Sequence, residues 1–256
     1  MKLQLLCLAL VFISVESNAA KHGKNVTIPA LIVFGDSIMD TGNNNRLPTL
    51  LKCNFPPYGK DFPGGLATGR FSDGRVPSDL IAEKLGIAKS LPAFMNPNLK
   101  PQDLLKGVTF ASGGTGYDPL TAKIMVCQRC SNDLAHTFMA QSHKYDPTSY
   151  ANFLADSAVK FVRELHKLGA KKIGVFSAVP VGCVPLQRTV FGGFEVADRG
   201  CCGRGSLAIS YMCNSLNPFT CSNSSAYIFW DSYHPTERAY QVMVDNLLHK
   251  YLSKIY

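Results

Sequence analysis

The chain has 256 residues, of which 46% are hydrophobic and 17% charged, a balance that excludes a disordered chain and fits a domain with a sizeable core. Its 26 Lys and Arg residues against 18 Asp and Glu residues give a net charge of +8. The basic residues are scattered, without the runs and interleaved aromatic residues of nucleic-acid binders. We therefore interpret the charge as a solvated surface and expect no nucleic-acid partner.

The N-terminus has the pattern of a signal peptide. Met1 and Lys2 precede an apolar run over residues 3–15, which is too short for a membrane span, and small residues follow at 17–20. Cleavage there would leave a single domain over residues 21–256 with eight of the 9 cysteines, an even number that suits an oxidising compartment. We expect a secreted, extracellular glycoprotein, since Asn25 and Asn223 open N-x-Ser/Thr triplets.

A short apolar run at residues 32–34 ends in Gly35, Asp36 and Ser37 and passes into a polar turn. This pattern predicts a serine at the carboxyl end of a strand, the edge of an open α/β sheet where ligands bind. N–H groups at a helix start there would point toward developing negative charge, so Ser37 is a candidate nucleophile. Taken alone, Asp36 and Ser37 also fit a simple helix cap.

A second candidate group lies near the C-terminus, where Asp231 stands three residues before His234 and just ahead of a helical pattern. One tight turn at this spacing can bring the carboxylate to the imidazole. Asp231 would then keep one ring nitrogen protonated and leave the other free to take a proton from a serine hydroxyl. Together with Ser37, this arrangement indicates a serine hydrolase.

These two blocks resemble the GDSL esterase/lipase family of the SGNH hydrolase superfamily, in particular its plant extracellular lipases. The resemblance implies a three-layer α/β/α, flavodoxin-like fold around a mostly parallel sheet, with Ser37, His234 and Asp231 as the triad. Residues 107–117 resemble the family's second block, which implies that Gly114 supplies an oxyanion-hole N–H. Residues 131–135 resemble the third block, which implies the same role for the side-chain amide of Asn132, although the lead-in at 125–130 is half polar.

Between these blocks, residues 56–75 predict a glycine-rich surface loop beside the site, to which we assign no chemistry. Spacing, proline starts and glycine stops predict helices over residues 77–85 and from Pro147 to Leu168, and residues 173–179 predict a buried strand. A last helix starts near Pro235. Its predicted buried stripe consists of Tyr240, Met243, Val244, Leu247, Leu248 and Tyr251.

The cysteines predict disulfides rather than a metal site. Cys127 and Cys130 form a lone Cys-x-x-Cys, with no second pair at zinc-ligand spacing. The segment from residue 198 to 221 is expected to be poor in regular structure and to be held by two local disulfides. Three pairings of its four cysteines remain open, namely of Cys201, Cys202, Cys213 and Cys221.

Two stretches of the family pattern are absent, between Leu120 and Ser131 and between Gly193 and Phe194. We therefore expect an incomplete sheet and a protein that is less stable and less active than a full-length relative. The reaction implied is hydrolysis of carboxylic esters, with a small-molecule, lipid or polyester substrate, no metal or cofactor, and a monomeric enzyme. The alternative is a secreted relative that is non-catalytic or impaired because strands are missing.

Overall fold

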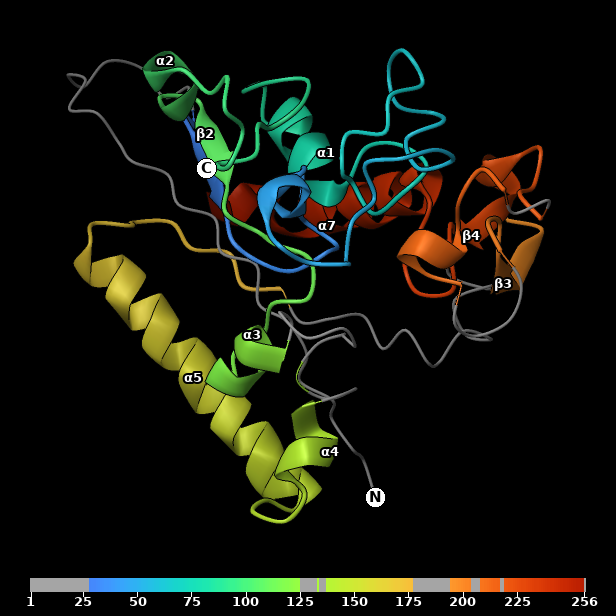
Figure 1. Ribbon diagram of the computed structural model, residues 1–256. Coiled ribbons are helices and arrows are strands. Elements are labelled where there is room, and N and C mark those ends of the chain that lie inside the picture. Colours follow the sequence, from blue (N-terminus) through green and yellow to red (C-terminus); the bar gives the residue numbers. More distant parts are fainter. Residues whose placement is uncertain are drawn as a thin grey trace, which may run out of the picture.

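The computed structural model describes residues 28–124, 133, 137–176, 194–203, 208–216 and 219–255 (Figure 1). The predicted signal peptide lies outside these residues. The strands are β1 (Leu31–Val33), β2 (Gly107–Thr109), β3 (Val196–Gly200) and β4 (Tyr227–Phe229). The α-helices are α1 (Pro77–Lys84), α2 (Pro101–Leu104), α3 (Pro119–Ile124), α4 (Phe138–Gln141), α5 (Pro147–Lys167) and α7 (Glu237–Ile255). Short 3₁₀ turns are η1 (Asn43–Arg46), η4 (Ser210–Met212) and η5 (Ser224–Ala226).

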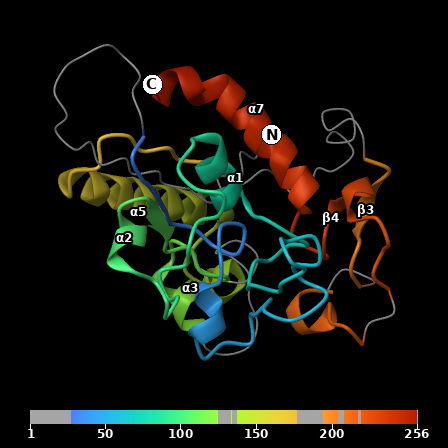
Figure 2. The same ribbon diagram turned by 90° about the horizontal axis from the view of Figure 1, so that it is seen from above.

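β1 and β2 pair in parallel, and their side chains face two helical layers. Leu31 and Val33 pack into a core with α1 and α7. The alternate residues Ile32 and Phe34 pack against α5, because successive side chains of a strand point to opposite faces. In Figure 2, α7 and α5 lie well apart from each other. This arrangement confirms the predicted α/β/α layering with parallel strands.

β3 and β4 form a second parallel pair, in which β3 was not expected. The segment from residue 198, which includes the end of β3, was predicted to be poor in regular structure. Its backbone nevertheless pairs with β4, and the pairing continues as Cys201 and Cys202 donate N–H groups to Phe229 and Trp230 at 3.0 and 2.7 Å. Asp198 is exposed, so a polar sequence costs little on this strand.

The four clustered cysteines form the disulfides Cys201–Cys221 and Cys202–Cys213. This pairing selects one of the three that the sequence left open. Both bonds lie immediately after β3 and attach Cys213 and Cys221 to the end of that strand. Cys53 is a buried free thiol, whereas Cys127 and Cys130 lie outside the described residues.

The helices predicted from local signals form close to their expected ends. α5 begins at Pro147 with Asp146 as its N-cap, which accepts hydrogen bonds from two backbone N–H groups. α7 spans the molecule from β4 to β1 (Figure 1), since Ala239 packs on β4 and Val244 in the core with β1. Its buried stripe ends at Leu248, and Tyr251 is 39% exposed, contrary to prediction. Within the described ranges, no helix is both long and apolar enough to span a bilayer.

The predicted strand at 173–179 does not form over its described part, residues 173–176, and Val175 is 52% exposed. A strand requires a backbone partner, and in the described part of the chain β1 pairs with β2 alone. Residues 173–176 therefore have no ladder to join. Each described sheet contains two strands, in agreement with the expectation of an incomplete sheet.

Candidate active site

Ser37 lies in the turn that follows β1, at the carboxyl end of the strand, and its side chain is only 6% exposed. Asp36 organises this turn: its carboxylate accepts the N–H of Ile38 at 3.1 Å, and its carbonyl accepts the N–H of Met39 at 3.1 Å. The turn directs the Ser37 hydroxyl toward the loop that follows β4.

Asp231 and His234 occupy one tight turn after β4, as their spacing predicted. Oδ1 of Asp231 accepts the N–H groups of Tyr233 and His234 at 2.8 and 2.7 Å. Oδ2 lies 2.8 Å from Nδ1 of His234. A carboxylate can only accept a hydrogen bond, so this contact assigns the ring proton to Nδ1.

The turns after β1 and β4 bring Ser37 and His234 together although 197 positions separate them in the chain. Nε2 of His234 lies 2.9 Å from Oγ of Ser37, and both side chains are buried. With its proton on Nδ1, the ring accepts the serine hydroxyl at Nε2. The geometry suits removal of a proton from Ser37 by a neutral imidazole.

Gly114 lies in the turn after β2 and has a φ of +85°, a backbone conformation that residues other than glycine rarely adopt. This turn is attached to the one before Ser37, because Ser112 N–H and the Thr115 hydroxyl both donate to the carbonyl of Gly35, at 3.0 and 2.8 Å. These two hydrogen bonds hold the turn of Gly114 beside the turn that carries Ser37.

Asp40 also holds this turn, a role that was not predicted. Its buried carboxylate accepts N–H groups from Gly42 and Asn43 at 2.7 Å each and from Gly113 at 3.0 Å. Burial raises the pKa of Asp40 to about 6. The polar run over residues 40–45 was the available signal, since such side chains commonly bond nearby backbone.

Asn132 lies outside the described residues. Its neighbour Asp133 is described, is buried, and accepts the N–H groups of Tyr117 and Asp118 at 2.7 and 3.0 Å. This carboxylate therefore connects the third sequence block to residues that closely follow Gly114.

The loop at 56–75 was predicted to be a surface loop without chemistry, and this interpretation is wrong for both of its ends. Tyr58 is buried and donates its hydroxyl to Oδ2 of Asp231 at 2.7 Å, and its phenolic oxygen accepts the N–H of Ser210 at 2.9 Å. Phe71 packs on the His234 ring, with centroids 5.0 Å apart. The exposed residues of the loop lie mainly in its middle, over 61–66.

Tyr58 carries no local sequence signal for this role, because its partner Asp231 is 173 residues away. Burial, together with the negative charge of Asp231, raises the pKa of Tyr58, so the phenol remains a donor. β3 packs closely against the backbone of Asp231, where a Cβ atom at Gly200 would lie 2.6 Å from the main-chain carbonyl oxygen of Asp231. A glycine is required at this approach.

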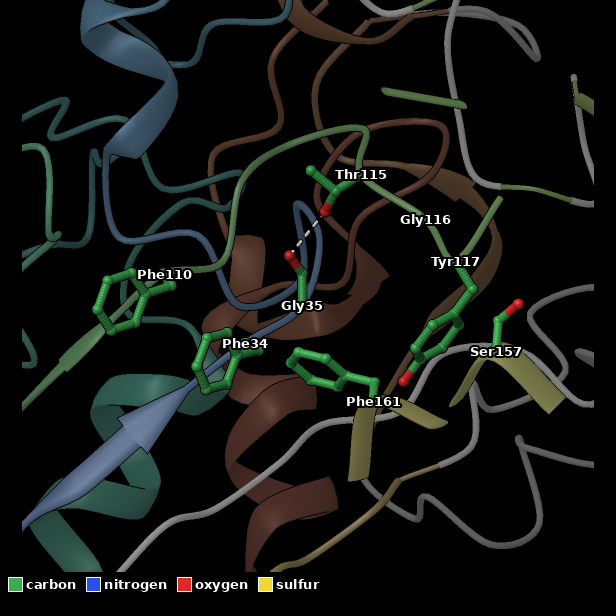
Figure 3. Close-up of a pocket in the computed structure, with 8 residues that line it drawn as sticks. All are labelled: Phe34, Gly35, Phe110, Thr115, Gly116, Tyr117, Ser157 and Phe161. Carbon is green, nitrogen blue, oxygen red and sulfur yellow. Dashed lines mark hydrogen bonds between the residues drawn. The ribbon is translucent and has the colours of Figure 1, made fainter. Parts of the chain in front are cut away.

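A pocket of about 390 Å³ adjoins the turns of Gly35 and Thr115, on the side of the sheet that α5 covers (Figure 3). In the part of the chain that the structure describes, no group of three or more His, Cys, Asp or Glu residues could hold a metal ion.

Residues 31–191 match the model of the GDSL-like lipase/acylhydrolase family. A GDSL esterase/lipase of Arabidopsis thaliana is 67% identical over 320 residues, and another is 63% identical over 349, each match covering 100% of both chains. A third from the same plant is 49% identical over 324 residues, covering 90% of this chain and 88% of the relative.

The first two alignments are longer than the 256 residues of this chain, so these relatives contain internal segments that it lacks. The matches confirm the reaction class expected from the sequence, hydrolysis of carboxylic esters. The chain therefore belongs to the GDSL-like lipase/acylhydrolase family.

Proposed function

We propose that this protein is a secreted serine esterase that uses Ser37 as nucleophile, His234 as general acid and base, and Asp231 to orient the imidazole. The observation that carries the proposal is the pair of contacts on the His234 ring, 2.9 Å from Nε2 to Ser37 and 2.8 Å from Nδ1 to Asp231. Serine hydrolases on unrelated folds share this arrangement.

The reaction follows from these contacts. Ser37 Oγ attacks the acyl carbon while its proton passes to Nε2 of His234, and the carbonyl oxygen becomes an oxyanion. The N–H groups of Ser37 and Gly114 and the amide of Asn132 stabilise that oxyanion. The alcohol then leaves with the proton from Nε2. Water gives a proton to the same nitrogen and attacks the acyl-enzyme, and the bond from the acyl carbon to Ser37 Oγ then breaks as Oγ takes that proton back and the acid is released.

The oxyanion assignments have separate support. The assignment of Gly114 is supported by its positive φ and by the hydrogen bonds that attach its turn to Gly35. For Asn132, the support is the contact of its neighbour Asp133 with Tyr117, which closely follows Gly114. The amide would donate to charge that develops in the transition state.

Hydrolysis of a 4-nitrophenyl acetate ester by purified protein tests the proposal. Ser37→Ala should lower kcat/KM by about 10³–10⁶, as removal of a triad nucleophile does. Ser142→Ala is the matched control, since Ser142 is an exposed serine beyond α4 and should leave the rate unchanged. Turnover by folded Ser37→Ala equal to wild type would contradict the triad. A folded wild type without turnover would favour the non-catalytic alternative.

The proposal of secretion rests on the pattern of residues 1–20 and on two disulfides, which persist in oxidising compartments. N-terminal sequencing of protein recovered from plant-cell culture medium should begin after Ala19 or Ala20. Retention of the intact chain inside the cells would contradict it.

A further inference from the structure

The pocket beside the nucleophile turn is walled largely by aromatic rings (Figure 3). Phe34 stacks on Phe110 and meets Phe161 edge to face, with ring centroids 5.2 Å apart in both pairs. Tyr117 and Ser157 lie on the opposite side of Phe161 from Phe34 in Figure 3. Its volume, about 390 Å³, is that of a small-ligand site.

The hydroxyl groups of Thr115 and Ser157 on the wall have partners within the protein. Thr115 donates to the carbonyl of Gly35 at 2.8 Å, drawn as a dashed line in Figure 3, and Ser157 donates to the carbonyl of Phe153 at 2.9 Å. Phe110 remains 39% exposed. A hydrocarbon group would bury this aromatic surface without displacing any of these hydrogen bonds.

The pocket adjoins both elements that would handle an ester. Gly35 stands two residues before Ser37, and Thr115 directly follows Gly114. The ring of His234 instead packs against Phe71 and Tyr233, neither of which lines the pocket. Because His234 must protonate the leaving alcohol, the alcohol belongs on its side, and the acyl group belongs on the pocket side.

We propose that this pocket binds the hydrocarbon chain of the acyl group, so that the enzyme prefers esters of medium-length apolar acids to acetyl esters. The inference rests on the proposed function for the position of the acyl carbon. The recognition itself is hydrophobic burial and can be measured without turnover.

Calorimetric binding to the Ser37→Ala protein provides that measurement, with 4-nitrophenyl acetate and 4-nitrophenyl octanoate as probes. Each methylene group that leaves water strengthens binding about fourfold, so the octanoate should bind at least about tenfold more tightly than the acetate. Adding Ser157→Phe, which fills the pocket from α5, should abolish this difference. Val159→Phe on the same helix is the control, because Val159 is 47% exposed, does not line the pocket and should leave the difference intact.

The outcomes separate the two proposals. Equal binding of both esters, or equal effects of Ser157→Phe and Val159→Phe, would overturn the acyl pocket. Chain-length-dependent binding by a wild type that hydrolyses neither ester would support the pocket and contradict the esterase. Hydrolysis of both esters with equal kcat/KM would support the esterase and contradict the acyl pocket. If circular dichroism shows that Ser157→Phe does not fold, the smaller Ser157→Leu should weaken octanoate binding by about threefold to tenfold, and no change would refute the proposal.

Discussion

Replacing Tyr58 by phenylalanine should destabilise the protein and slow catalysis, although Tyr58 would touch no substrate. Its hydroxyl receives Ser210 N–H at 2.9 Å and donates to Asp231 Oδ2 at 2.7 Å. Tyr58→Phe removes both bonds in a fully buried place and adds no new group. The Asp231 carboxylate then keeps its contacts with His234 and Tyr233.

The size of the effect follows from these two bonds. A hydrogen bond to a charged group contributes about 1.5–3 kcal/mol, and a buried N–H left without a partner costs about 1–3 kcal/mol. Together these give an expected loss of about 2.5–6 kcal/mol in the free energy of unfolding, against a usual total of about 5–15 kcal/mol. The value of kcat should fall about tenfold, well short of the roughly 10⁴-fold loss that follows alteration of a triad carboxylate.

Tyr240→Phe is the matched control for Tyr58→Phe. Tyr240 is equally buried, and its hydroxyl has no hydrogen-bond partner among the residues that the structure describes. Its loss should change the free energy of unfolding by less than about 0.5 kcal/mol. Urea unfolding and ester turnover of both variants test the reasoning. The reasoning is wrong if Tyr58→Phe and Tyr240→Phe change the free energy of unfolding and the ester turnover by equal amounts.

Four further results are expected. Because the pKa of Asp40 is raised from 3.8 to about 6, the folded state binds its proton more tightly, so the Asp40 contribution to the free energy of unfolding falls as pH rises from about 4 to about 6. Asp40→Asn should remove up to about 1.4 kcal/mol per pH unit of that slope in urea titrations, and an unchanged slope would contradict this. Cys213→Ser should lower stability by about 2–4 kcal/mol by opening the bond to Cys202, and an unaltered unfolding midpoint would show otherwise. Asn132→Ala should reduce kcat by about 10²–10³ with little change in KM, whereas an unchanged kcat would exclude Asn132 from the oxyanion hole. Finally, this chain should unfold at lower urea and turn over more slowly than a relative carrying the additional segments; a sharp transition and full turnover would refute that expectation.

Features encoded by neighbouring residues could be predicted well. Asp146 and Pro147 mark the start of α5, and Gly169 follows its end, because capping and helix termination depend on a few adjacent positions. The contact of Asp231 with His234 is likewise confined to one turn. The family resemblance then predicted that Ser37 belongs to the same site as Asp231 and His234.

Features that depend on distant partners could not be predicted. β3 is a strand because its backbone pairs with β4, which side-chain periodicity does not report. Conversely, residues 173–176 have the apolar pattern of a strand but no described neighbour with which to pair. The partnership of Tyr58 with Asp231 spans 173 positions and leaves no trace in the local sequence.

Labelling with a serine-directed phosphonate tests the central claim, that Ser37 is a nucleophile activated by His234, most directly. The reagent reports the reactivity of the hydroxyl itself and does not depend on which ester is the natural substrate. Mass spectrometry of the digested protein should find one adduct, on the peptide that contains Ser37, and His234→Ala should slow its formation by several orders of magnitude. An adduct on another serine, or labelling at an equal rate without His234, would contradict the account.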